Sequence, residues 1–112
     1  MDIKNKNMNL LRFIEYLKDE DKALQFMKET YPEIDYYDAE IYLKDSLSAD
    51  SDLVIFDSEK IEGLIEMRKD NNTYYYLFSL DLLAEVYADY SRITETDHEI
   101  VEKIINYRIS DA

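Results

Sequence analysis

The stretch LVIFDSEKIEGLIEMRKDNNTYYYLF, residues 53–78, decides the fold class of this chain. It begins with the β-prone run LVIF at residues 53–56. It ends with TYYYLF at residues 73–78, which is rich in the aromatic residues that favour strands. Between them, Asp-Asn-Asn at residues 70–72 is a typical turn sequence. We therefore predict a three-stranded antiparallel meander over about residues 52–79.

The middle of that stretch, residues 58–69, admits two interpretations. Ile61, Leu64 and Ile65 fit the spacing of a helix as well as that of a strand. Gly63, the single glycine of the chain, argues against a helix here, and a tyrosine-rich strand follows. These two features favour a hairpin, and a helix over residues 58–69 is the alternative.

An amphipathic helix is predicted near the start of the chain. Residues 10–17 carry apolar side chains at i, i+3, i+4 and i+7, and Asn7 or Asn9 can serve as the N-cap. Residues 1–7 show no periodicity, so we expect them to form a frayed end. A charged cluster at residues 18–22 then interrupts the apolar stripe. Either two helices meet there or one helix runs through it.

Two further helical stretches are predicted before residue 52, the first of which is either a second helix or the continuation of the first. An apolar stripe over residues 23–30 is followed by Pro32, which biases the preceding residue away from helical geometry and so ends the run. Asp35 is a good N-cap residue, and the apolar residues that follow it fit a helix to about Leu47. The Ser/Ala/Asp sequence of residues 46–51 predicts a loop.

A helix pair is predicted after the sheet. The apolar side chains of residues 83–90 repeat at helical spacing, and the pattern breaks at residues 94–96. Thr96 and Glu99 form a capping box for a final helix that buries isoleucines between residues 100 and 109. The chain is therefore expected to be a single α+β domain, residues 1–112, with N-terminal helices, a small three-stranded sheet and a C-terminal helix pair.

The composition is strongly acidic. The 112 residues include 26 Asp and Glu and 13 Lys and Arg, which gives a formal net charge of −13. A surface of this charge repels phosphate, so direct binding of nucleic acid is close to excluded. Solubility alone needs a net charge of only roughly 2–8 in magnitude. We therefore interpret the excess as part of the function.

Several kinds of chemistry are excluded by residue counts. The chain has no cysteine, which excludes disulfides, thiolate nucleophiles and cysteine-based metal centres. One glycine cannot build the glycine-rich loops that bind nucleotide phosphates. No apolar run approaches the ~18 residues that a membrane span needs. We expect no cofactor and no contact with a membrane.

Candidates for catalysis and for metal binding are weak. His98 is the single histidine, and no nucleophile elbow accompanies it. Asp50, Asp52, Asp57 and Glu59 offer oxygen ligands. However, hydrophobic residues lie between them, where a calcium loop needs glycine and further ligands. We therefore predict no catalytic residue, no metal site and no enzymatic activity.

Negative charge and tyrosine are concentrated together between residues 29 and 62. Eleven acidic residues and two lysines give this segment a net charge of −9. Carboxylates three or four residues apart on a helix lie about 5–6 Å from each other, a spacing comparable to that of phosphates on a DNA strand. Tyrosine favours interfaces because it combines apolar area with a hydrogen-bonding tip. The residues predicted to contact a partner are Glu33, Asp35, Tyr36, Tyr37, Asp38, Asp45, Asp50, Asp52, Asp57 and Glu59.

In size, composition and charge pattern the chain resembles the small acidic proteins that phages use against host defence. These are the DNA-mimicking antirestriction proteins and the anti-CRISPR proteins. The resemblance is one of composition and extends over the whole chain. No diagnostic motif is matched, so no individual residue is assigned a role from it. It implies a protein that acts in the cytoplasm of a host bacterial cell. There it would bind a basic nucleic-acid-binding enzyme and block the groove meant for DNA or RNA.

Three other functions are open at this point. The chain could be an immunity or antitoxin protein that neutralises a basic nuclease toxin, since the same physics applies. It could be a small enzyme or metal-binding regulator, which would require convergent carboxylates. It could also be an adaptor or structural phage protein whose acidic residues serve solubility alone. An exposed edge of the sheet could in addition pair with a second copy to form a homodimer.

Overall fold

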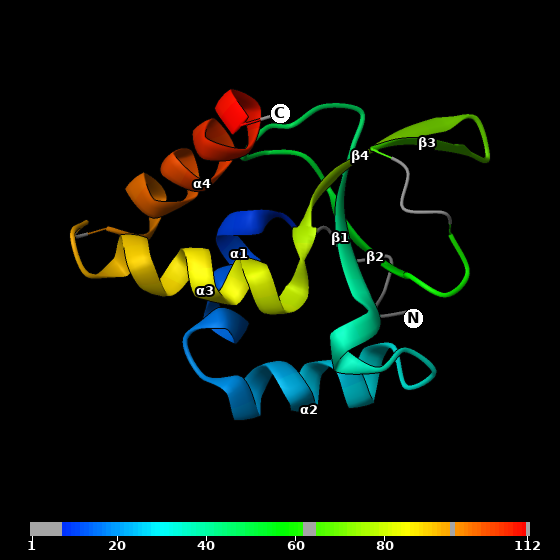
Figure 1. The fold of residues 1–112 in the computed structure, drawn as a ribbon, viewed down its shortest axis with the longest axis horizontal. Coiled ribbons are helices and arrows are strands. Elements are labelled where there is room, and N and C mark those ends of the chain that lie inside the picture. Colours follow the sequence, from blue (N-terminus) through cyan, green and yellow to red (C-terminus); the bar gives the residue numbers. More distant parts are fainter. Residues whose placement is uncertain (1–7, 62–64, 95, 112) are drawn as a thin grey trace.

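The computed structural model describes residues 8–61, 65–94 and 96–111 (Figure 1). Within these residues the fold is α+β, as predicted, with a four-stranded antiparallel sheet in place of the three strands expected. No described helix is long and apolar enough to cross a membrane. The elements in chain order are α1 (Leu10–Leu17), α2 (Glu20–Thr30), the one-turn 3₁₀ helix η2 (Tyr36–Asp38), β1 (Ala39–Lys44), β2 (Leu53–Asp57), β3 (Glu66–Lys69), β4 (Asn72–Ser79), α3 (Leu80–Ser91) and α4 (Asp97–Asp111).

The strands are ordered β2-β1-β4-β3 across the sheet. The hairpin between β3 and β4 turns at Asp70 and Asn71, whose φ angles are 53° and 69°. Asp and Asn tolerate this left-handed region better than most residues because their short polar side chains bond to the local backbone. The predicted turn at residues 70–72 and the predicted strand at residues 73–78 are therefore confirmed.

The helix predicted from Asp35 to about Leu47 is wrong. Asp35 does act as an N-cap, and its carboxylate accepts the N–H of Tyr37, but the helix that follows is the single turn η2. Residues 39–44 form β1, in which Ala39, Ile41 and Leu43 are buried on one face of the sheet. Strand β1 pairs with both β2 and β4. These long-range ladders outweigh the helical spacing of the apolar side chains.

The predicted meander is also wrong in its connectivity. Strand β2 pairs with β1, not with β3, so the strands of residues 52–79 do not follow one another across the sheet. Of the ambiguous segment 58–69, residues 58–60 form a turn and residues 66–69 form β3, so the helical alternative is not found there. Gly63 and the predicted frayed end at residues 1–7 lie outside the described residues.

The helices lie on one side of the sheet (Figure 1). The strand side chains that face them, including Ile41 and Leu43 of β1 and Ile55 of β2, are buried against the apolar stripes of α1, α3 and α4. Full burial of one such side chain contributes about 1.5–3 kcal/mol. Helix caps follow the prediction. Asn9 accepts the N–H of Arg12 at 3.0 Å, and Thr96 accepts the N–H of Glu99 at 3.2 Å.

The opposite face of the sheet carries a cluster of aromatic rings. Tyr42 is fully buried, with the ring centroids of Phe56 and Tyr76 at 5.3 Å and 5.5 Å, and Phe56 also meets Tyr74 at 5.4 Å. Edge-to-face pairs of this kind contribute roughly 0.5–1.5 kcal/mol beyond the burial of their area. The rings therefore pack against one another on the outer face, and Arg108 of α4 lies over the ring of Tyr76. Tyr74 and Tyr76 share this face because alternate strand residues point the same way.

Candidate interaction surface

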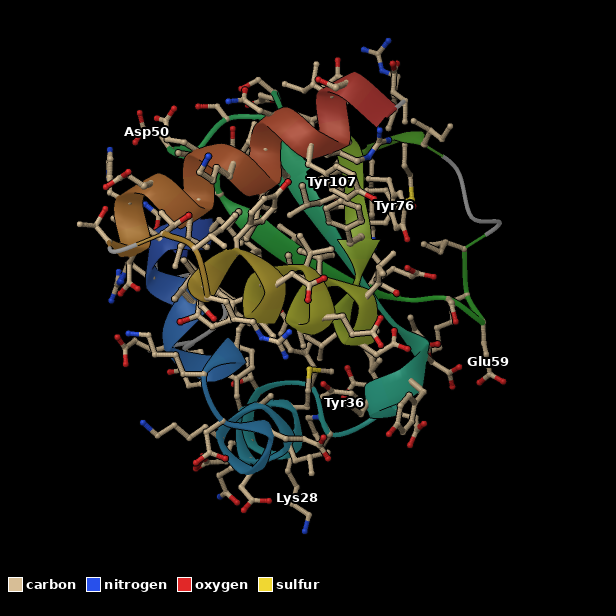
Figure 2. All side chains as sticks on the ribbon, turned by 60° about the vertical axis from the view of Figure 1, so that its left-hand side comes forward. Lys28, Tyr36, Asp50, Glu59, Tyr76 and Tyr107 are labelled. Carbon is tan, nitrogen blue, oxygen red and sulfur yellow. The ribbon has the colours of Figure 1, made fainter. Side chains whose placement is uncertain are left out.

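The residues predicted to contact a partner lie in two groups at opposite ends of the β1–β2 ribbon. Figure 2 shows Tyr36 and Glu59 on one side of the molecule and Asp50 on the other. A strand rises about 3.3 Å per residue, so the chain from Asp38 to Asp45 covers roughly 23 Å. The first group, named here the η2 surface, consists of Glu33, Asp35, Tyr36, Tyr37, Asp38, Asp57 and Glu59. The second, named the loop surface, consists of Asp45, Asp50 and Asp52.

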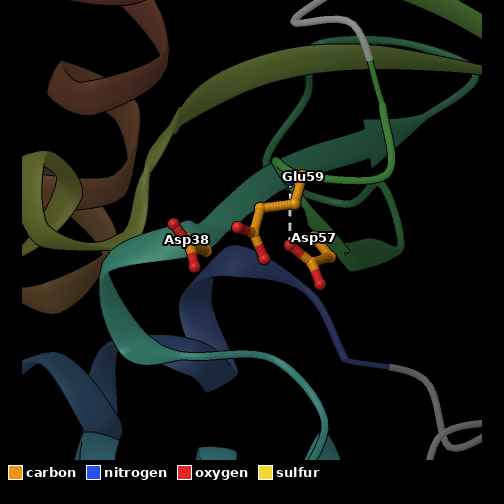
Figure 3. A group of neighbouring side chains, drawn as sticks. All are labelled: Asp38, Asp57 and Glu59. Carbon is orange, nitrogen blue, oxygen red and sulfur yellow. Dashed lines mark hydrogen bonds between the residues drawn. The ribbon is translucent and has the colours of Figure 1, made fainter.

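Strand register assembles the η2 surface. Because β1 and β2 are antiparallel, with Ala39 opposite Asp57, the first residue before β1 lies beside the residues that follow β2. The amide of Ser58 donates to the carbonyl oxygen of Asp38 at 2.8 Å and extends the ladder by one step. Carboxylate oxygens of Asp38, Asp57 and Glu59 consequently all lie within 4.8 Å of one another (Figure 3).

Local hydrogen bonds hold two of the three carboxylates, those of Asp57 and Asp38. The amide of Glu59 donates to Oδ1 of Asp57 at 3.0 Å, and the hydroxyl of Ser58 donates to Oδ1 of Asp38 at 3.5 Å. Among the described residues the ion pairs are those of Lys18 with Glu15 and Asp97, so the three carboxylates have no cationic partner there. Like charges at this separation repel by about 1 kcal/mol even in water. A cation that approached them would relieve that repulsion.

This cluster is also the group of described residues best suited to hold a metal ion. Hard cations such as Ca²⁺ prefer carboxylate oxygens, but Ca²⁺ takes about six to eight of them. Here Asp57 is buried, Asp38 half-buried and Glu59 exposed. The sequence suggested Asp50 and Asp52 as companions of Asp57 and Glu59. The structure instead brings Asp38 to them and leaves Asp50 and Asp52 on the loop surface.

Two grooves border the η2 surface. The larger, of about 740 Å³, lies between α2 and the chain at residues 31–36 and is lined by Glu33, Asp35 and Tyr36. The smaller, of about 280 Å³, lies beside β2 and is lined by Phe56 and Asp57. The two grooves share a wall. The residues that line both are Tyr31, Glu33 and Ile34.

Two tyrosines stand between these acidic groups. The rings of Tyr36 and Tyr37 meet edge to face with centroids 5.0 Å apart, and Tyr37 exposes 69% of its surface. Burial, and then the negative charge of Glu20, raises the pKa of Tyr36 above 10.0. The Tyr36 hydroxyl therefore keeps its proton at neutral pH and can donate a hydrogen bond. An exposed ring beside acidic groups is suited to stack on an arginine side chain.

The loop surface is ordered by its own hydrogen bonds. Asp45 has a φ of 68°, and its amide donates to the carbonyl oxygen of Thr73 at 2.7 Å. The Ser51 hydroxyl donates to the carbonyl oxygen of Ser46 at 2.7 Å, and the amide of Asp50 donates to the Ser48 hydroxyl at 3.3 Å. These contacts shape a shallow hollow of about 300 Å³ that Asp45, Asp50 and Asp52 line. The predicted acidic residues thus form two local surfaces, not one array.

A half-buried carboxylate on the outer face of the sheet was missed by sequence reasoning. Glu40 lies beside the Tyr76 hydroxyl, and its Oε2 atom is buried without a hydrogen-bond partner among the described residues. Burial raises the pKa of Glu40 above 4.5, against the opposite effect of the Tyr76 bond. Burial and Glu40 together raise the pKa of Tyr76 to about 12. The alternation of Glu40, Tyr42 and Lys44 was the signal in the sequence.

Comparisons with protein-family models, with curated proteins and with solved structures find no match to this chain.

Proposed function

We propose that this protein inhibits a nucleic-acid-binding defence enzyme of a bacterial host, a CRISPR effector or a restriction enzyme, by occupying its basic groove. The observation that supports this most directly is the η2 surface. It gathers five carboxylates and two tyrosines at one end of the fold. Asp38, Asp57 and Glu59 form no ion pair with a described residue. Of the three, Glu59 is exposed, Asp38 is half-buried and Asp57 is buried, so a partner would contact Glu59 and Asp38 directly.

The spacing of charge fits a groove that holds a nucleic acid. Strand register brings Asp38, Asp57 and Glu59 of the η2 surface together before a partner binds. The loop surface lies roughly 23 Å further along the ribbon. That is about seven base-pair steps at ~3.4 Å each. A cationic groove that follows a duplex could therefore meet both acidic surfaces at once.

The tyrosines add contacts that phosphates cannot make. Tyrosine rings give contact area at a low entropic cost, and arginine is enriched at the centre of interfaces. Tyr37 is exposed, and Tyr36 lines the larger groove beside Glu33 and Asp35. An arginine of the partner could stack on a ring and pair with a neighbouring carboxylate. The tyrosines would thus supply affinity, while the net charge of −13 would accelerate the encounter.

Affinity capture from a bacterial lysate tests this proposal. The immobilised protein is exposed to lysate at low salt and eluted with a salt gradient, and each eluted protein is assayed for binding to DNA and RNA. We expect a basic nucleic-acid-binding enzyme whose binding weakens steeply with salt and whose nucleic acid competes with the inhibitor. Binding that is equally strong at high salt would contradict the proposal. Capture of a nuclease toxin would replace it with the immunity-protein alternative.

A matched pair of variants localises the contact. The test variant combines Asp35→Asn, Asp38→Asn and Glu59→Gln. The control combines Glu85→Gln, Asp89→Asn and Glu102→Gln, all exposed on α3 and α4. Both lose the same charge, so general steering falls equally. We expect the test variant to lose more than ~10-fold in affinity for the captured enzyme beyond the control. Equal losses would mean that no particular surface is used.

A further inference from the structure

The outer edge of the sheet at β2 has backbone groups that point away from β1. In an antiparallel pair, hydrogen-bonded residues alternate with residues whose N–H and C=O face outward. The amide of Lys44 donates to the carbonyl oxygen of Asp52, and the amide of Ser58 donates to that of Asp38. By alternation from these two pairs, Val54 and Phe56 are the residues of β2 that bond to β1. Ile55 lies between them. Its N–H and C=O therefore point away from β1, toward the outer edge of the sheet.

One end of this edge is already occupied. The amide of Leu53 donates to the carbonyl oxygen of Met8 at 2.6 Å, which confirms that alternate residues of β2 face outward. No backbone hydrogen bond joins Ile55 to a described residue at that edge. A strand edge whose outward-facing groups have no partner among the described residues is a template for another strand.

A groove lies beside these outward-facing groups. The groove of about 280 Å³ is lined on one side by Ile55, Phe56 and Asp57 of β2 and on the other by Tyr31, Glu33 and Ile34. Three of its lining residues are consecutive in β2, so this strand forms part of its wall. A chain in extended conformation would have backbone partners on one side and side-chain contacts on the other.

We propose that the β2 edge binds an extended segment of a partner protein that carries basic side chains at alternate positions. The segment would add to the sheet as a further strand, with backbone hydrogen bonds to Ile55. Side chains of an extended strand alternate between two faces. One set would lie near Glu33 and Asp57, and the other near Phe56.

Charge explains why the segment should be basic on one face and uncharged on the other. Glu33 and Asp57 line the groove, and Asp38 and Glu59 lie beside Asp57. The ammonium group of Lys69 lies 5.5 Å from the centre of the Phe56 ring, on the outer face. Lys69 itself and Lys60 also line the groove. The Phe56 side thus already holds a cation and favours uncharged residues, while the carboxylate side favours lysine or arginine.

A second copy of this chain is the less suitable occupant. Pairing of two β2 strands around Ile55 would place Asp52 and Asp57 of both copies along one seam. Like charges at a strand pair repel. A basic segment at the same edge would instead be attracted by these carboxylates. The choice of a basic segment rests on the proposed function. The experiments below test strand addition and the proposed function separately.

Hydrogen exchange of the full chain, measured by NMR, tests the edge directly. In the free protein we expect the Ile55 amide to exchange at least ~10-fold faster than those of Val54 and Phe56, which bond to β1. A synthetic peptide of alternating lysine and valine should then slow exchange at Ile55. Slow exchange in the free protein would overturn the inference, because the edge would already be covered. So would a peptide that leaves Ile55 unprotected.

Two controls separate strand addition from charge. The first is the same peptide with alternate backbone nitrogens methylated, which keeps the charge but removes the donors. We expect it to bind about 10-fold more weakly. Equal binding would overturn strand addition and leave the proposed function intact. The second is Glu33→Gln against Glu102→Gln. Only the former should weaken peptide binding, and equal effects of the two variants would overturn the choice of a basic segment.

Two further results complete the test. Dimerisation of the free chain with protection of Ile55 would replace the basic segment with a second copy. If the peptide protects Ile55 but lysate capture yields no salt-sensitive nucleic-acid-binding enzyme, the proposed function fails and the edge inference stands.

Discussion

The carbonyl oxygen of Asp38 accepts the amide hydrogen of Ser58 at 2.8 Å, one step beyond the ends of β1 and β2. This bond carries the ladder into the turn after β2. It brings the carboxylate of Asp38 within 4.8 Å of those of Asp57 and Glu59. Backbone pairing, which is indifferent to charge, thus assembles an acidic group that side-chain electrostatics alone would disperse. Repulsion among the three carboxylates therefore lowers the free energy of unfolding.

Neutralising part of this cluster should stabilise the fold. The double variant Asp38→Asn, Glu59→Gln removes like-charge repulsion and keeps hydrogen-bond acceptors. We expect the free energy of unfolding in urea to rise by roughly 0.5–1 kcal/mol. Glu85→Gln combined with Glu102→Gln serves as the control for net charge and should give a smaller change. A loss of stability in the test variant would show that the charges themselves support the turn.

Divalent cations should not stabilise the protein beyond their effect as salt. The cluster brings together one oxygen from each of three carboxylates, at most half of the roughly six to eight that a calcium site takes. A site that binds only the folded state must raise Tm as the cation concentration passes its Kd. We expect equal Tm values in millimolar CaCl₂ or MgCl₂ and in NaCl of the same ionic strength. A specific rise in Tm that is absent from the Asp38→Asn, Glu59→Gln variant would identify a metal site and revive the metal-binding alternative.

Arg108 should contribute strongly to stability, although it is a charged residue. Its side chain is 8% exposed, its Nε donates to the carbonyl oxygen of Tyr76 at 3.0 Å, and its guanidinium lies 5.8 Å from the Tyr76 ring centre. Arg108→Ala leaves that carbonyl without its donor and removes buried packing. We expect a loss of about 2–3 kcal/mol in urea unfolding. Lys103→Ala, exposed on the same helix, should change stability little. Equal effects of the two would contradict the structural role.

Glu40 should make stability depend on pH in an unusual direction. Burial raises its pKa above 4.5 in the folded state, so that state binds a proton more tightly than the unfolded chain does. Stability from this group is therefore fully present below pH 4.5 and is lost as pH rises through the raised pKa. Glu40→Gln removes the buried charge and keeps an acceptor for Tyr76. We expect it to be more stable than the parent at neutral pH, by a margin that shrinks in acid.

The check on Glu40 is urea unfolding at several pH values, with Glu85→Gln as an exposed control. The control should show no such trend. A Glu40→Gln variant that is less stable than the parent at neutral pH would mean that the ionised carboxylate is satisfied in solution. The Oε2 atom would then have a partner that the described residues do not supply.

Local sequence determined the elements whose signals are local. The apolar stripe and Asn9 cap predict α1, and the Thr96–Glu99 pair predicts the start of α4. The turn at Asp70 and Asn71 predicts the β3–β4 hairpin for the same reason. Each signal lies within a few residues of the structure that it specifies, because helix and tight-turn hydrogen bonds join near neighbours in the chain.

Only the tertiary structure decided β1 and the candidate surface. The apolar residues of 36–47 fit helical spacing, yet hydrogen bonds from β2 and β4 make residues 39–44 the centre of the sheet. The same pairing places Asp38 beside Asp57 and leaves Asp50 at the other end of the ribbon. Composition and charge alone do not distinguish these three residues. Sequence determined how much charge this protein carries. Strand register decided which carboxylates lie close together, because a ladder pairs residues that are far apart in the sequence.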